Sequence, residues 1–366
     1  MIRFLMIGGF LGAGKTTTVL RMARHYTEQG LRVGLVTNDQ ATDLVDTHTL
    51  RAAGFHVGEV AGACFCCKFD ELVATLQQLE VEHTPDVIIC EPVGSCTDLM
   101  ATVVEPLRRY YGDEFQVGPL AVLLKPEHGR RILLSAEPVG VSAAAAYIFT
   151  KQLEEADIIA INKIDKLSTE QQRSLLEATQ QRFPDRPVLP LSARNGQGFA
   201  EFTEALAETS VSSVESMEID YDLYAKGEAE LGWLNATFEL STGANQSIPL
   251  DHTVFELLTD LAKYYHDAGA DSVHTKILIA DHGGNQSLAN LVAADAEPEL
   301  SISSGANANA VVVTINARVN VSPDVLANWV KSSMHSLCER QSWRCQQVDL
   351  QSLTPGRPQP THRLPG

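Results

Sequence analysis

The sequence has no hydrophobic run long enough to cross a membrane and comparatively few basic residues. No apolar stretch reaches the roughly 18 residues that a membrane-spanning helix requires. Lysine and arginine together number 28, against 46 aspartates and glutamates, and the formal net charge is -18. A strongly acidic surface repels phosphate backbones and anionic lipids. We therefore expect no nucleic-acid partner and no membrane partner.

The cysteines lack the even number and even spread of a secreted disulfide framework. There are seven, and three of them crowd together at Cys64, Cys66 and Cys67. This pattern is typical of reduced thiols and predicts a cytoplasmic protein. Internal repeats and low-complexity tracts are also missing.

Short apolar runs separated by helical segments dominate the first half of the chain. This alternation predicts an α/β domain with a parallel sheet covered on both faces, over residues 1–208. The expected strands are 2–7, 32–38, 86–91, 118–124, 157–162 and 187–192.

A polar, acidic stretch at 209–230 is predicted to connect this domain to a second one at 231–350. Three expected strands, 231–241, 273–281 and 309–321, alternate with helices at 251–269 and 322–341. Asp251 is the expected N-cap of the first helix, and Ser322 with Pro323 opens the second. The pattern predicts a smaller α+β domain. The Pro-rich, basic tail at 351–366 is expected to be a solvated terminus without regular structure, and contact of Arg357, His362 and Arg363 with the nucleotide or a client is the alternative.

The segment after the first strand matches the GxxxxGK[ST] phosphate-binding loop. Glycines there allow backbone N–H groups to surround phosphates, and the following helix N-terminus favours the same anion. Lys15 is expected to contact the β- and γ-phosphates, and the Thr16 hydroxyl to bind Mg²⁺. The residues expected to bind nucleotide in this loop are Gly9, Gly12, Ala13, Gly14, Lys15, Thr16 and Thr17.

Two later motifs favour guanine as the base. In the tetrapeptide NKID, Asp165 can accept hydrogen bonds from the N1 and N2 donors of guanine, which adenine lacks, while Asn162 and Lys163 brace the loop. In LSAR, Ser192 and Ala193 follow another apolar strand, where a backbone N–H can reach the guanine O6. The predicted ligands are GTP and GDP.

The carboxylate that assists Mg²⁺ is expected at the end of a strand. Glu91 ends the strand 86–91 and is followed by Gly94, whose N–H can contact the γ-phosphate. Asp39 is a second candidate near Mg²⁺, with a turn-forming role as the alternative. The predicted catalytic residues for hydrolysis are Lys15, Thr16 and Glu91. No glutamine stands where it would position the attacking water, which predicts slow intrinsic hydrolysis.

The cluster Cys64-Phe-Cys66-Cys67 places three thiols where they can converge on one soft cation. Three thiolates and one further ligand suit tetrahedral Zn²⁺, with Co²⁺ as the next candidate. A redox pair and small buried hydrophobic side chains are the alternatives. Cys90 is expected in the core, and Cys96 is either a further ligand or an ordinary loop residue.

With these motifs in place, the chain resembles the CobW-like family of P-loop GTPases, which includes zinc-transferring and cobalamin-related members. The resemblance rests on GGFLGAGKTT, on the CFCC cluster, on Glu91-Pro-Val-Gly and on EEADIIAINKID, and covers about the first 205 residues. It implies a metallochaperone whose nucleotide state controls release of metal to a client metalloprotein or a cobalamin-related protein. A homodimer is a further implied partner.

The chain also departs from the family pattern. Asn38-Asp39-Gln40-Ala41-Thr42-Asp43 stands where the family has Asn-Glu-Phe-Gly-Glu, so the second carboxylate is lost or moved to Asp43. Leu124-Lys125-Pro126 replaces Val-Asp-Ala, and a His-rich run is missing. The client therefore stays open. The alternative function is a GTP-dependent chaperone or regulatory switch for a cobalamin-dependent enzyme, without direct metal transfer.

Overall fold

The structure of the protein is a computed structural model. The structure describes residues 1–41, 44–135, 141–209, 217–243, 246–270, 273–294 and 296–364. The chain forms two compact units. The first comprises Met1–Gln40, Ala53–Gly227 and Arg357–Gly366, and the second comprises Ala41–Ala52 and Glu228–Gly356.

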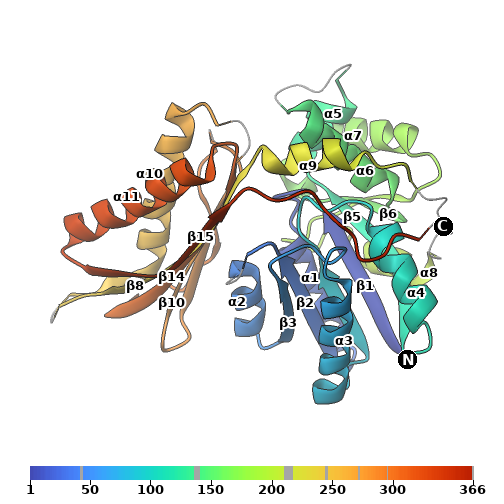
Figure 1. Ribbon diagram of the computed structural model, residues 1–366, viewed down its shortest axis with the longest axis horizontal. Coiled ribbons are helices and arrows are strands. Elements are labelled where there is room, and N and C mark those ends of the chain that lie inside the picture. The colour runs from blue at the N-terminus through green and yellow to red at the C-terminus, as the bar shows by residue number, and fades with distance from the viewer. Residues whose placement is uncertain are drawn as a thin grey trace. The chain divides into compact units, whose positions relative to one another are not determined.

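A seven-stranded sheet forms the centre of the first unit, and every neighbouring pair of strands is parallel. Its order is β3-β2-β4-β1-β5-β6-β7, with helices packed around it (Figure 1). The strands are β1 (Ile2–Gly9), β2 (Val33–Asp39), β3 (His56–Ala61), β4 (Val87–Glu91), β5 (Phe115–Leu124), β6 (Ile158–Ile161) and β7 (Val188–Pro190). The four central strands consist almost wholly of buried aliphatic side chains, as a sheet covered on both faces requires.

The connecting helices follow the expected alternation with the strands. They are α1 (Lys15–Glu28), α3 (Phe69–His83), α4 (Glu105–Tyr111), α5 (Pro126–Leu133), α6 (Ala143–Glu154), α7 (Thr169–Arg182), α8 (Phe199–Glu208) and α9 (Tyr221–Ala229). A π-helical turn, Met100–Val104, precedes α4, and a 3₁₀ turn, Ile164–Lys166, follows β6. The prediction of a parallel α/β sheet is confirmed, and β3 is an additional strand at its edge.

The second unit contains a six-stranded antiparallel sheet with the order β12-β11-β10-β14-β8-β15. Its elements are β8 (Gly232–Ser241), α10 (Leu250–Asp267), β10 (Val273–Asp281), β11 (Gln286–Leu291), β12 (Glu299–Ile302), β14 (Ala310–Val319), α11 (Pro323–Gln341) and β15 (Arg344–Leu353), with a small pair of strands, β9 (Ile248–Pro249) and β13 (Asn307–Ala308). The helices α10 and α11 share one apolar core with the sheet. The smaller second domain with an antiparallel sheet is therefore confirmed.

In this unit, the start of α11 agrees with the prediction from the sequence, and the start of α10 does not. Ser322 caps α11 by accepting a hydrogen bond from Val325 N, and Pro323 is its first residue. The expectation that Asp251 caps α10 is wrong, because this helix begins at Leu250. The Asp251 carboxylate instead accepts hydrogen bonds from Ser303, Ser304 N and Gly305 N and thereby fixes the loop after β12.

One helix of the second unit comes from the N-terminal part of the chain. The helix α2 (Val45–Ala52) follows β2 in sequence but packs with β10 and β14, where Val45 N donates a 2.8 Å hydrogen bond to Asn316 Oδ1. Asp43, the alternative position for the second carboxylate, lies outside the described residues. Among the helices that the structure describes, none combines the length and apolar character of a membrane span.

Candidate functional site

The phosphate-binding loop joins β1 to α1 at the carboxyl edge of the parallel sheet. Gly9 has φ +135°, and a Cβ there would lie 2.5 Å from Leu123 O, so only glycine fits this turn. Gly12 and Gly14 also have positive φ, at +74° and +94°. Lys15 Nζ donates a 3.1 Å hydrogen bond to Gly9 O. The Lys15 side chain therefore lies over the loop in which its ammonium is expected to contact phosphate. Ala13 is buried, and Thr17 is exposed in the first turn of α1.

The two predicted base-binding loops meet at the phosphate loop. Asn162 Nδ2 donates to Ala13 O at 2.8 Å, and Asn162 Oδ1 accepts from Ala193 N at 2.9 Å. Ser192 Oγ donates to Asp165 Oδ1 at 2.6 Å. Lys163 adopts a left-handed backbone, with φ +61°, between these anchors. The Asp165 carboxylate is therefore fixed in an exposed position that can face a base.

The residues predicted near Mg²⁺ lie beside the same loop. Thr16 Oγ1 donates a 3.0 Å hydrogen bond to Glu91 Oε1 at the end of β4. A Cβ on Gly94 would meet Leu11 Cδ2 at 2.7 Å and Lys15 Nζ at 3.1 Å, so the Gly94 backbone packs directly on the phosphate loop. Asp39 ends β2 at the same sheet edge. A hydroxyl beside a carboxylate is a donor set that fits Mg²⁺.

The three cysteines form a turn that leads into α3. The Sγ atoms are separated by 2.9 Å (Cys64–Cys66), 3.3 Å (Cys64–Cys67) and 3.7 Å (Cys66–Cys67). Cys64 and Cys66 are buried, and Cys67 is partly exposed. Four thiolates around Zn²⁺, with bonds of about 2.3 Å, would place sulfurs about 3.8 Å apart. The cluster thus needs only a small expansion to hold a metal.

Contacts within the cluster shift the pKa values of its three thiols in different directions. Hydrogen bonds shared with Cys66, Cys67 and Cys96 hold the pKa of Cys64 well below its usual range. The hydrogen bond with Cys64 raises the pKa of Cys67 to about 11, and the same partner together with burial raises the pKa of Cys66. Cys64 is therefore the first thiol to ionise. The positive end of the following helix also favours a thiolate at this turn.

Asn38 holds the cysteine turn against β2, a role that the sequence did not reveal. Its side-chain Nδ2 donates to Val60 O and Ala63 O, both at 2.8 Å, and its Oδ1 accepts from Phe65 N at 2.9 Å. All three partners belong to β3 or to the turn itself. Asn38 directly precedes Asp39, so the end of β2 contributes both to the sheet edge that carries the phosphate loop and to the cysteine turn.

The segment from Glu91 to Asp98 passes from the phosphate loop to the cysteines. Gln152 Nε2 fixes its middle by donating to Gly94 O at 3.0 Å and to Cys96 O at 2.8 Å. The Cys96 side chain is buried, and its proximity to Cys64 helps to lower the pKa of that thiol. Cys90, in contrast, lies in the core of β4, as expected. A single segment therefore contacts both predicted ligand sites.

The C-terminal tail is bound to this unit, and the expectation of a solvated terminus is wrong. Thr361 N donates to Cys66 O at 2.8 Å, and Gln359 N donates to Cys67 Sγ at 3.2 Å. Arg363 pairs with Asp98 at 2.7 Å. These contacts join residues more than 250 positions apart, and the donors of Gln359 and Thr361 named here are backbone N–H groups, which any sequence possesses. The expected lack of regular structure is nevertheless found after Leu353.

Comparison with known proteins places these motifs in one family. The CobW/HypB/UreG nucleotide-binding domain matches residues 3–190, more than half of the chain. Zinc chaperone YeiR of Escherichia coli (strain K12) is 29% identical over 196 residues, which are 52% of this chain and 55% of YeiR. Zinc chaperone CobW of Sinorhizobium sp. is 24% identical over 249 residues, or 60% of this chain and 66% of that protein. The chain thus spans less than two thirds of either relative.

Solved structures of low identity are also similar. HypB from Helicobacter pylori in complex with nickel has a TM-score of 0.41 and 19% identity, and the match covers 57% of this chain and 86% of HypB. The zinc-bound YjiA GTPase from E. coli has a TM-score of 0.34 and 12% identity, with 90% of this chain and 98% of YjiA covered. The phosphate loop lies within the residues that the family matches. The chain belongs to the CobW/HypB/UreG family, with its nucleotide-binding domain at residues 3–190.

Proposed function

We propose that this protein is a GTP-hydrolysing metallochaperone that carries Zn²⁺ or Co²⁺ on Cys64, Cys66 and Cys67 and delivers it to a client metalloprotein. The observation that carries the proposal is the gathering of these three thiols at the sheet edge where the phosphate loop also lies. The names of two relatives, both described as zinc chaperones, favour zinc as the cargo.

The hydrogen bonds around Asp165 support GTP as the nucleotide. Ser192 orients the carboxylate, and Asn162 ties the base-binding loop to Ala13, so the base and phosphate positions are set relative to each other. A fixed carboxylate accepts two hydrogen bonds from guanine and would be left desolvated and unpaired against adenine. Unpaired polar groups of this kind make the affinities for two such ligands differ by large factors.

Thr16 and Glu91 would hold Mg²⁺ beside the phosphates, through the hydroxyl and through an intervening water. When bound, Mg²⁺ neutralises charge that develops on the phosphate oxygens during hydrolysis. Lys15 supplies a second positive charge once its Nζ leaves Gly9 O for phosphate. Because the Gly94 backbone packs on the phosphate loop, its N–H would be able to report whether a γ-phosphate is present.

A transition metal would displace protons from the cysteine turn. Three thiolates leave one tetrahedral position, and the Cys96 sulfur beside Cys64 is the fourth ligand that we favour. Because Cys96 lies two residues after Gly94, a shift of this segment on GTP binding or hydrolysis would alter the metal site. Linkage requires the converse, so bound metal must change GTP affinity by the same factor.

The direct test is metal affinity in each nucleotide state. Zn²⁺ and Co²⁺ are titrated into the reduced, full-length protein against a competing chelator, with a non-hydrolysable GTP analogue, with GDP and without nucleotide. We expect one metal per chain and an affinity that differs by about ten-fold or more between the GTP-analogue and GDP states. GTP hydrolysis is measured with and without metal.

The matched control is the variant in which all three cysteines are replaced by serine. Loss of metal binding with retained GTP binding supports the carrier function. Metal binding that survives this replacement, or identical affinities in every nucleotide state, would contradict it. In that case a GTP-dependent switch acting on a cobalamin-dependent enzyme becomes the better explanation.

A further inference from the structure

The last described residues of the chain lie across the cysteine turn. We call residues 357–364 the C-terminal strap; it is the dark-red segment that runs beside α4 in Figure 1. Thr361 contributes twice, by donating through N to Cys66 O at 2.8 Å and through Oγ1 to Cys67 O at 3.2 Å. The His362 ring packs edge-on against Phe69, with the centroids 5.1 Å apart.

One contact of the strap reaches a sulfur atom directly. Gln359 N lies 3.2 Å from Cys67 Sγ and donates a hydrogen bond to it. Cys67 is the only one of the three cluster cysteines with appreciable exposure. The strap therefore occupies the open side of the cluster.

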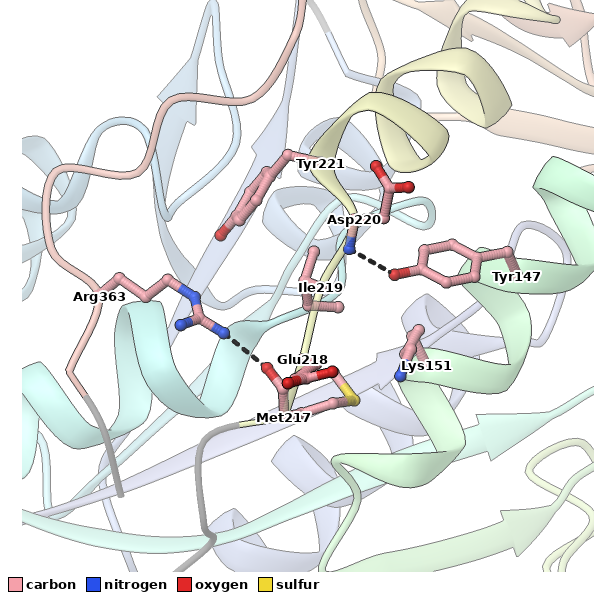
Figure 2. Close-up of a pocket in the computed structure, with 8 residues that line it drawn as sticks. All are labelled: Tyr147, Lys151, Met217, Glu218, Ile219, Asp220, Tyr221 and Arg363. Carbon is pink, nitrogen blue, oxygen red and sulfur yellow. Dashed lines mark hydrogen bonds between the residues drawn. The ribbon is translucent and has the colours of Figure 1, made fainter.

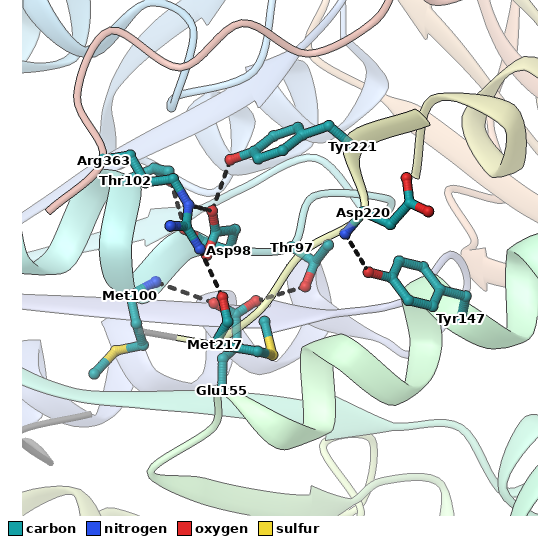
Figure 3. Close-up of polar contacts among 10 residues, drawn as sticks. All are labelled: Thr97, Asp98, Met100, Thr102, Tyr147, Glu155, Met217, Asp220, Tyr221 and Arg363. Atoms are coloured by element: carbon teal, nitrogen blue, oxygen red, sulfur yellow. Dashed lines mark hydrogen bonds and ion pairs between the residues drawn. The ribbon is translucent and has the colours of Figure 1, made fainter. Parts of the chain in front are cut away.

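An ion pair with a buried partner fastens the strap. Arg363 Nε lies 2.7 Å from Asp98 Oδ2, and the side chain of Asp98 is only 2% exposed. Tyr221 OH donates to the same oxygen at 2.6 Å, and Arg363 Nη2 donates to Met217 O at 2.6 Å (Figure 3). Leu364 N adds a hydrogen bond to Ala101 O. Asp98 would be a buried, weakly compensated charge without Arg363.

Asp98 belongs to the segment that begins at Glu91. This segment contacts Thr16 at its start, packs on Lys15 at Gly94 and contacts Cys64 through Cys96. Asp98 itself has a left-handed backbone, with φ +66°, and its carbonyl accepts from Thr102 N and Oγ1. A displacement of Gly94 by a γ-phosphate would therefore reach the carboxylate that holds the strap.

Arg363 can leave this pairing without unfolding the core. It lines an open pocket of about 670 Å³, whose other lining residues are Tyr147, Lys151 and Met217–Tyr221 (Figure 2). The Arg363 side chain is 36% exposed, in contrast to the buried side chain of Asp98. Arg363, and not Asp98, is thus the partner of the pair that is in contact with solvent.

We propose that the C-terminal strap is a lid on the metal site and that Arg363–Asp98 is the latch which couples the lid to the nucleotide. With the latch closed, the strap covers the cluster and donates to Cys67. When the Glu91–Asp98 segment shifts, the latch weakens and the metal exchanges with a client. The role of the lid in metal exchange depends on the function proposed above, whereas the coverage of Cys67 does not.

The test compares two arginines of the same strap. Arg363→Ala removes the latch, and Arg357→Ala removes an exposed ion pair with Asp222 as the matched control. Without metal, the alkylation rate of Cys67 by iodoacetamide is measured by peptide mass spectrometry, with the exposed Cys345 as internal reference. We expect Arg363→Ala to raise the Cys67 rate about ten-fold relative to Cys345, and Arg357→Ala to change it less than about two-fold.

The zinc-loaded proteins provide the second readout. Transfer of Zn²⁺ to a chelator should be about ten-fold faster in Arg363→Ala and in a chain ending at Gly356 than in the wild type. Arg363→Lys, which keeps the charge but loses the bidentate geometry, should be intermediate. Cys67 labelling in the wild type should differ between the GTP analogue and GDP.

Three outcomes would overturn the lid. These are equal Cys67 rates in Arg363→Ala and wild type, equal effects of the two arginine variants, and nucleotide-independent labelling. Failure of the protein to bind zinc at all would instead refute the metallochaperone function, while the labelling result would still decide whether the strap covers Cys67.

Discussion

Ser192 Oγ donates a 2.6 Å hydrogen bond to Asp165 Oδ1. The serine follows β7, and the aspartate belongs to the turn after β6, so the bond joins two neighbouring strand ends of the parallel sheet. It leaves the other carboxylate oxygen of Asp165 available to a ligand. The proposed preference for guanine would therefore depend on two loops whose spacing the sheet determines.

Asp165→Asn should change the base preference from guanine to xanthine. The asparagine amide NH₂ cannot accept from the guanine 2-amino group, but it can donate to the xanthine O2 that replaces it. We expect GTP affinity to fall about 100-fold and XTP affinity to rise. Competition between labelled GTP and each triphosphate measures both changes. Asp185→Asn, at an exposed position before β7, is the control, and an unchanged GTP affinity in Asp165→Asn would exclude Asp165 from the base site.

Asn38→Ala should separate metal binding from nucleotide binding. The substitution removes three hydrogen bonds that hold the cysteine turn and leaves the buried Phe65 N–H without its acceptor. We expect a loss of about 2–4 kcal/mol in the free energy of unfolding. Zinc affinity should fall about ten-fold because the thiols lose their preorganised positions, while GTP affinity changes little.

Denaturant unfolding and the chelator competition measure these two effects. Asn290→Ala is the matched control, since Asn290 makes an exposed hydrogen bond to Ser301 in the second unit. Equal losses of zinc and GTP affinity in Asn38→Ala would mean that the substitution disturbs the whole sheet edge and not the cysteine turn.

The central strands and the phosphate loop were predictable because their signals are local. β1, β4, β5 and β6 are short runs of buried aliphatic residues, and the glycines and Lys15 stand at the spacing that phosphate binding requires. Among the strands that were missed, β3, β12 and β15 are edge strands of their sheets, whereas β11 is an inner strand, and β9 and β13 form a separate two-stranded pair. Edge strands bury one side at most, so their sequences, such as RCQQVDLQSL for β15, show little hydrophobic alternation.

The surroundings of the cysteines were not predictable for a different reason. The motif itself identified the three thiols, but Asn38, Gln359 and Thr361 reach them through contacts that depend on the folded chain. Gln359 uses a backbone N–H, which leaves no signature in the side chain. The strap also returns from the second unit to the first, a path that no local pattern encodes.

Glu155 should make the protein less stable as the pH rises from about 5 to 8. The side chain is fully buried and accepts hydrogen bonds from Thr97 Oγ1 and Met100 N (Figure 3). Burial, aided by the nearby charge of Asp98, raises its pKa to about 8. The folded state therefore keeps a proton that the unfolded state releases above pH 4.5. The free energy of unfolding then falls by up to about 1.4 kcal/mol per pH unit from this group.

Glu155→Gln removes this titration while keeping an acceptor for Thr97. Denaturant unfolding at pH 6 and pH 8 should show a smaller loss of stability in the variant than in the wild type, by about 1–2 kcal/mol. The two proteins differ only at residue 155, so the contributions of all other groups cancel in the comparison. Glu177→Gln, on an exposed carboxylate that faces Arg173, is the matched control. A parallel pH dependence in Glu155→Gln and wild type would show that Glu155 is ionised in the folded protein.

Cys96→Ala should weaken metal binding without unfolding the protein, because we propose the Cys96 sulfur as the fourth ligand beside the cluster of Cys64, Cys66 and Cys67. Cys90→Ala is the matched control: both cysteines are buried on the same stretch of chain, but Cys90 lies in β4. We expect zinc affinity to fall about ten-fold or more in Cys96→Ala and to stay near the wild-type value in Cys90→Ala. With Co²⁺, the thiolate charge-transfer absorption should drop by about a quarter in Cys96→Ala, because one of four sulfur ligands is lost. If both variants keep the wild-type spectrum and affinity, the fourth ligand must come from outside this segment, with water or a client side chain as the remaining donors.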